Sequence, residues 1–177
     1  PKLSQGYKFR KGDLVFTVLV ISYSGYSSDT ARMAAIGHPP KSAEKVCDIL
    51  ATVGGMIIEM AKPGVRVADL YSRGIDLLEQ KLPYSHGKLG PALGHGIGIC
   101  LPDSLGLGPH EEPWLVPSSD AILEPNMTLN IELLYNYLGI GVFGVEDTIQ
   151  ITERGNKRLS KLPRELHMIC LLYTSPS

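Results

Sequence analysis

The chain has 177 residues, 44% of them hydrophobic and 20% charged, and its formal net charge is −1 at pH 7. This length suits one globular core and is short for two, and the balanced charge excludes the basic field expected of a protein that binds nucleic acid or an anionic membrane. Three cysteines without a Cys-x-x-Cys pair, and the lack of a signal peptide or a membrane-spanning apolar run, favour a reducing, cytoplasmic compartment.

The first predicted elements are a hairpin and two helices. Residues 14–22 form an apolar strand, which turns through residues 23–25 into a second strand that ends near Ile36. Apolar residues at helical spacing predict amphipathic helices over residues 42–61 and 67–80.

Two longer strands are predicted after a segment of short strands and loops that follows Gly90. The stretch MTLNIELLYNY, residues 127–137, alternates as a strand does, and so do residues 142–152. A turn over residues 152–160 closes the set. Helices on one face of a mostly antiparallel sheet predict an α+β fold.

Four residues of this pattern suit a metal site. Glu132 and Glu146 lie in strands rich in Ile, Val and Leu, where a buried carboxylate is expensive unless a cation or hydrogen bonds compensate it. Each glutamate alone is explained equally well by a solvent-facing position on a half-exposed sheet. Together with Asp29 in GYSSDTAR and His95 in GHGIG, they form a set of oxygen and nitrogen donors typical of a divalent ion.

The motifs, in this order, resemble the pita-bread (M24) metallopeptidase family, which includes proline-specific aminopeptidases, prolidases and creatinase. GYSSDTAR is similar to the family's GYxSDxxR, GHGIG to its glycine-flanked metal histidine, and VEDT to its closing glutamate. The resemblance covers residues 9–160 and implies a curved, mostly antiparallel sheet with helices on its outer face. The metal ligands that it implies are Asp29, His95, Glu132 and Glu146.

The chain departs from the family at one implied ligand. The family's first aspartate stands eleven residues before the second, and that position is Val18 here. A glycine of the family is replaced by Val20, and the Pro-Gly that often follows the first glutamate is replaced by Leu133 and Leu134. The resemblance with this gap implies a site that holds one ion, where the intact family holds two.

The chemistry implied by the resemblance is hydrolysis of the N-terminal residue of a short peptide, often with proline second, by a metal-activated water. His95 is then both ligand and catalytic residue, Glu132 is ligand and general base, and His110 in PHEEP stabilises the tetrahedral intermediate. Oxygen-rich ligation favours one or two ions of manganese, cobalt or iron.

Two other functions stay open. A non-peptidase enzyme of the creatinase or lyase type, acting on a small C–N or C–S compound, fits the extra loop over residues 101–109. A metal-free peptide-binding module fits the loss of the aspartate at Val18. The expected partner is a peptide or a small molecule, and the resemblance implies a possible homodimer for the full-length protein.

Both ends are expected to be cut. Residues 1–169 are predicted to form an N-terminally incomplete catalytic domain, because the family carries helices and a further histidine before the first strand. Residues 170–177, CLLYTSPS, resemble the translation of a sequencing adapter and are predicted to lie outside the fold. Val18 is therefore either true divergence or an error upstream.

Overall fold

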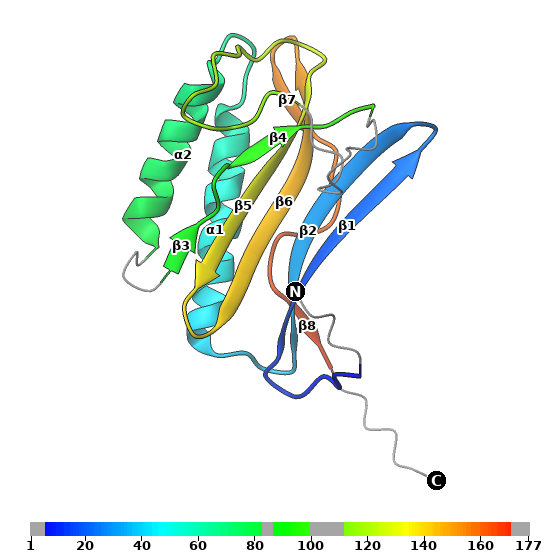
Figure 1. Cartoon of the computed structure of the whole chain (residues 1–177), viewed down its shortest axis with the longest axis vertical. Helices are drawn as coiled ribbons and strands as arrows, with labels where there is room; N and C mark the ends of the chain where they lie inside the picture. Colours follow the sequence, from blue (N-terminus) through cyan, green and yellow to red (C-terminus); the bar gives the residue numbers. More distant parts are fainter. Residues whose placement is uncertain (1–5, 83–86, 100–111, 171–177) are drawn as a thin grey trace.

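The computed structural model describes residues 6–82, 87–99 and 112–170 of the chain, and its elements form two sheets and a helical layer (Figure 1). The smaller sheet has the order β1-β2-β8, where β1 (Leu14–Tyr23) and β2 (Tyr26–Ile36) are the predicted hairpin. The third strand, β8 (His167–Ile169), pairs in parallel with the end of β2. No strand was predicted at β8, because three residues are too few to show an alternating pattern.

The larger sheet is built on the two glutamate strands. β5 (Thr128–Tyr137) pairs antiparallel with β6 (Gly141–Thr152), and the short strands β3 (Gly87–Leu89) and β4 (Gly94–Gly96) both pair with the other edge of β5. The mostly antiparallel sheets and two helices confirm the predicted α+β class.

One predicted turn contains a further strand. β7 (Gly155–Arg158) folds back on β6 within residues 152–160, which were expected to form a turn alone. Its sequence, GNKR, has no apolar alternation, so the pattern gave no strand signal. Asn156 fixes it by donating hydrogen bonds of 2.5 and 2.9 Å to the carbonyl oxygens of Ile58 and Ala61, at the end of the first helix.

The helices α1 (Lys41–Met60) and α2 (Val67–Lys81) lie together on one face of the larger sheet (Figure 1). α1 ends just before Pro63, because the residue that precedes a proline disfavours helical backbone. Its buried side chains pack on β5 and β6 and form the core with them: Ala43, Val46, Cys47, Leu50, Val53, Ile57 and Ile58 of the helix, and Leu129, Ile131, Leu133, Phe143 and Val145 of the strands.

In the described residues, no helix is both long enough and apolar enough to cross a membrane.

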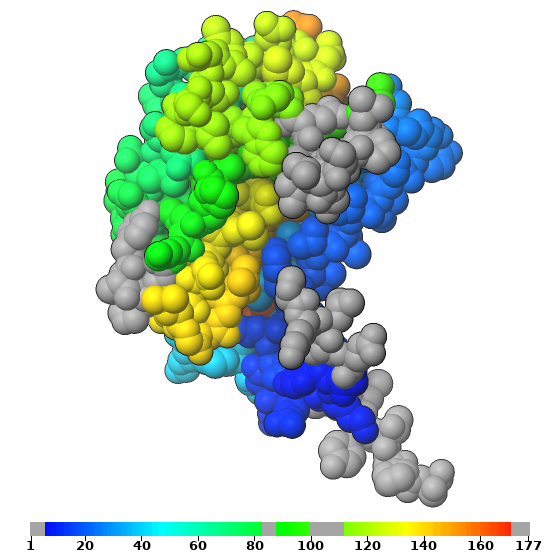
Figure 2. All heavy atoms as spheres, viewed as in Figure 1, coloured from blue at the N-terminus to red at the C-terminus, as the bar shows by residue number. Residues whose placement is uncertain are grey.

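The β1-β2 hairpin stands away from the helical layer (Figure 2). β1 is the edge strand of its sheet, and its residues from Thr17 to Tyr23 are all exposed although most are apolar. Val18, the residue at the position of the missing aspartate, is 45% exposed. Val18 pairs with Ala31, and Val20, two residues further along β1, pairs with Asp29. Alternate residues of a strand point to the same side, so Val18 and Asp29 share a face of the hairpin.

A close approach of β4 to β5 requires glycine at position 94. Gly94 has a φ of +145°, and a Cβ atom there would lie 2.0 Å from the carbonyl oxygen of Asn130. We expect Gly94→Ala to lower the free energy of unfolding by about 3 kcal/mol or more, because β4 has to move off β5.

Urea unfolding measures this effect. Gly155→Ala is the matched control, since nothing lies within 4 Å of a Cβ at that position, and it should change stability by less than about 0.5 kcal/mol. Equal unfolding midpoints for the two variants would contradict the close packing of β4.

Candidate metal centre

Three of the predicted ligands meet inside the protein. Asp29 on β2, His95 on β4 and Glu146 on β6 each offer one ligand atom, and these atoms lie within 4.8 Å of one another. The three side chains are 4%, 1% and 1% exposed. The solvent-facing position considered for Glu146 is therefore wrong, and its carboxylate is buried with a second carboxylate and an imidazole.

Strand pairing with β5 brings two of these residues together. His95 lies opposite Asn130 on one edge of β5, while Glu146 lies opposite Glu132 on the other edge. Asn130 and Glu132 are alternate residues of one strand, so all four side chains belong to the same face of the sheet. Asp29 reaches this face from the smaller sheet, where β2 runs beside β6.

The orientation of the His95 ring is set by its own strand. Nδ1 lies 2.7 Å from the carbonyl oxygen of Gly96, which places the proton on Nδ1 and leaves Nε2 as the metal-binding nitrogen. Nε2 lies 3.7 Å from Oε1 of Glu146. The indole of Trp114 lies at a tilt to the imidazole of His95, with ring centroids 5.5 Å apart. Trp114 thus packs against the imidazole of His95.

The Glu146 carboxylate is also oriented by an amide. Nδ2 of Asn130 donates a 2.8 Å hydrogen bond to Oε1 of Glu146, and Oγ1 of Thr148 donates a 2.7 Å bond to Oδ1 of Asn130. Oε2 of Glu146 and Oδ1 of Asp29, by contrast, are buried without a hydrogen-bond partner among the described residues. Buried acceptors left in this way fit a cation between them, and Asp29, His95 and Glu146 would hold it.

The charges at this point shift the pKa values of the site residues. Burial raises the pKa of Asp29 and of Glu146. The charge of Glu132 raises the pKa of Asp29 further, and the charge of Asp29 raises that of Glu146 further. Burial lowers the pKa of His95, but Glu146, the Gly96 carbonyl and Glu132 outweigh it, so the net pKa is raised. Without a cation, the carboxyl groups hold protons more readily than in water.

Glu132 lies beside these three residues and outside their close cluster. It is directly across from Glu146 on β5 and is partly buried. Burial and the charge of Glu146 raise its pKa to about 7. A partly buried carboxyl group beside the cluster is placed to accept and return a proton.

Other predicted features are placed differently. His110 and the loop over residues 101–109 lie outside the described residues. Asn130 and Trp114 were not predicted at all, because an amide in a strand and an indole in a loop have no motif of their own. The apolar alternation around Asn130 was the one available signal, since a polar residue facing the same side as Glu132 marks a polar face.

Most of the chain is similar to known proteins. The profile of metallopeptidase family M24 matches residues 3–153. The Xaa-Pro dipeptidase of Pyrococcus horikoshii is 32% identical over 160 residues, which are 90% of this chain and 42% of that protein.

Solved structures give the same fold. The prolidase from Pyrococcus horikoshii has a TM-score of 0.80 at 30% identity and matches 90% of this chain and 43% of its own. The X-Pro aminopeptidase from Thermotoga maritima has a TM-score of 0.80 at 25% identity, with 90% and 42% covered. The chain thus spans less than half the length of these relatives. With the family profile matched over residues 3–153 and the pita-bread fold in place, the chain belongs to metallopeptidase family M24.

Proposed function

We propose that the protein is a metal-dependent peptidase of the Xaa-Pro dipeptidase or aminopeptidase type, which removes the N-terminal residue of a short peptide. The observation that carries the proposal is the buried cluster of Asp29, His95 and Glu146, two of whose carboxylate oxygens lack a hydrogen-bond partner in the described chain. The names of the relatives, dipeptidase and prolidase, support the substrate class.

One ion suits the described residues better than two. The strand that faces Asp29 from the hairpin is LVFTVLVISY, which contains no carboxylate, imidazole or thiol. Val18 and Val20 offer hydrocarbon where a second ion needs an anionic ligand. The proposed site is therefore mononuclear and is formed by Asp29, His95 and Glu146, with Glu132 at its side.

Each residue has a separate role in the proposed reaction. A divalent ion, when bound, supplies a lowered pKa for water and polarises the scissile carbonyl. The Glu132 carboxylate, which lies across from Glu146 beside the cluster, accepts the proton of the attacking water and returns it to the leaving amine. Asn130 orients the Glu146 carboxylate by a hydrogen bond, and Trp114 packs against the His95 ring. Val18 and Val20 are exposed on the hairpin face that carries Asp29 and would offer an apolar surface to substrate groups.

The metal site is tested by calorimetric titration of the native chain with manganese and cobalt. We expect one bound equivalent, none in His95→Ala, and an unchanged equivalent in His38→Ala, whose histidine is exposed in a turn. Val18→Asp should raise the number to two, because it places a carboxylate on the same face as Asp29. A folded native chain that binds no ion would favour the metal-free binding module instead.

The substrate class is tested by incubating the cobalt-loaded chain with Xaa-Pro dipeptides and with small amidino or sulfonium compounds. We expect release of proline from the dipeptides, and a loss of at least about a hundredfold in Glu132→Gln because the general base is removed. Turnover of the small compounds alone would point to the creatinase or lyase type of enzyme. His95→Ala gives the background rate.

The raised pKa values predict how stability depends on pH. Glu132 has a pKa of about 7 in the folded chain against an ordinary value of 4.5. Between these two pH values, the folded metal-free chain therefore keeps a proton that the unfolded chain has released. The contribution of Glu132 to the free energy of unfolding is fully present below pH 4.5 and is lost as the pH rises to 7 and above. The loss amounts to at most about 3 kcal/mol. The raised pKa values of Asp29, Glu146 and His95 act in the same direction.

Urea unfolding in EDTA between pH 4.5 and 8 measures this loss of stability. Glu132→Gln should flatten the decline, and Glu153→Gln, an exposed control, should leave it unchanged. A metal-free chain that becomes more stable over the same range would contradict the assigned shifts.

A further inference from the structure

Two of the metal ligands come from strands that share no backbone ladder. β2 carries Asp29 and β6 carries Glu146, and the two strands belong to different sheets of the described chain. The distance between the two carboxylates is therefore not fixed by strand pairing. Side chains that join β2 to β6 near the site have to set it.

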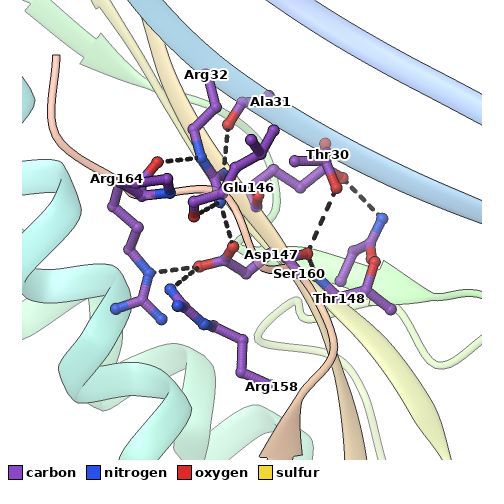
Figure 3. A network of polar contacts seen from close by, with 12 residues as sticks. Thr30, Ala31, Arg32, Glu146, Asp147, Thr148, Arg158, Ser160 and Arg164 are labelled. Atoms are coloured by element: carbon purple, nitrogen blue, oxygen red, sulfur yellow. Dashed lines mark hydrogen bonds and ion pairs between the residues drawn. The ribbon is translucent and has the colours of Figure 1, made fainter. Parts of the chain in front are cut away.

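Arg32 makes the densest of these connections (Figure 3). It lies on β2 three residues beyond Asp29 and is 6% exposed. Its Nη1 donates a 2.5 Å hydrogen bond to the carbonyl oxygen of Glu146, and its Nη2 donates a 2.6 Å bond to Oδ1 of Asp147. The guanidinium thus binds the backbone of one metal ligand and the side chain of the next residue.

All the donors of this guanidinium are used. Nη1 also donates to the Ala31 carbonyl at 2.7 Å, Nη2 to Leu162 at 2.8 Å, and Nε to Pro163 at 2.7 Å. A guanidinium has five N–H donors in a rigid plane, and each of them has an acceptor here. Such a group is held in one orientation, so it fixes the position of β2 relative to β6.

Asp147 binds two further arginines on its other oxygen. Arg164 donates to Oδ2, and Nη1 of Arg158 lies 3.7 Å from the same atom. Asp147 is 2% exposed, and its charge stays compensated if Arg32 is removed. Neither Arg158 nor Arg164 hydrogen-bonds to the Glu146 carbonyl in the described structure. The three arginines therefore share a partner, and Arg32 alone among them also binds the backbone of a metal ligand.

We propose that Arg32 is a positioning residue for the metal centre, which sets the separation of the Asp29 and Glu146 carboxylates by holding the Glu146 carbonyl and the Asp147 carboxylate together. This role rests on the proposed function, since it concerns the same ion. A lysine at position 32 keeps the charge but has its donors on one atom, so it cannot reach acceptors on β6 and on residues 162–163 at once.

Cobalt binding to the full chain tests the proposal. Arg32→Lys and Arg32→Gln should bind Co²⁺ about 10- to 100-fold more weakly and show a changed visible absorption spectrum, because the ligand geometry is altered. Arg158→Gln, which loses a contact with Asp147 but none with Glu146, should bind within about twofold of the native chain and keep its spectrum. Urea unfolding shows how much stability each variant has lost.

Two results would overturn the proposal. One is native affinity and spectrum in Arg32→Lys, and the other is an equal loss of cobalt binding in Arg158→Gln, which would indicate general loosening. If the native chain itself binds no cobalt, the proposed function fails, and crystal structures of the metal-free native and Arg32→Lys chains then decide the role of Arg32. We expect the two carboxylates to move about 1 Å apart in the variant, and an unchanged separation would refute the role.

Discussion

Buried negative charge is the constraint on which the site depends. Asp29, Glu132 and Glu146 converge on one face of the larger sheet, and in the described residues His95 is the basic side chain that meets them. Carboxylates taken out of water repel one another unless protons or a cation intervene. The raised pKa values and the unpartnered oxygens are two expressions of this single condition. Because the chain belongs to a family of metallopeptidases, a divalent cation is the compensating charge that we propose for these carboxylates.

Glu146 and Asp147 are neighbouring buried acids whose charges are compensated differently on the two faces of β6. Neighbouring residues of a strand point to opposite sides, so one acid enters the metal centre while the next enters a cluster of arginines. The first is poorly compensated by the described residues, whereas the second is compensated by three arginines. A short stretch of β6 thus joins the proposed metal centre to a cluster of ion pairs that the protein completes by itself.

Much of this arrangement could be predicted from sequence. The hairpin, both helices and the two glutamate strands follow from apolar periodicity, and Asp29, His95 and Glu146 follow from motifs in a fixed order. β7 and β8 could not be predicted, because a polar stretch of four residues and a stretch of three residues show no alternating pattern and form strands only where they meet a partner. The roles of Arg32 and Asn130 are also invisible in the sequence, since they consist of hydrogen bonds between strands that are distant along the chain. The position of Glu132 beside the cluster is likewise a result of three-dimensional register.

The exposed strand β1 has a consequence for handling the isolated chain. It is ten residues long, contains neither a charged residue nor a proline, and occupies the edge of its sheet in the described structure. Natural sheets protect such edges with lysine, proline or a covering segment, because a bare edge is a template for another strand. We therefore expect copies of this chain to associate along β1 at high concentration. A charged residue in place of Ile21, which is 61% exposed and lies on the hairpin face opposite to Asp29, would improve solubility while leaving the buried ligands untouched.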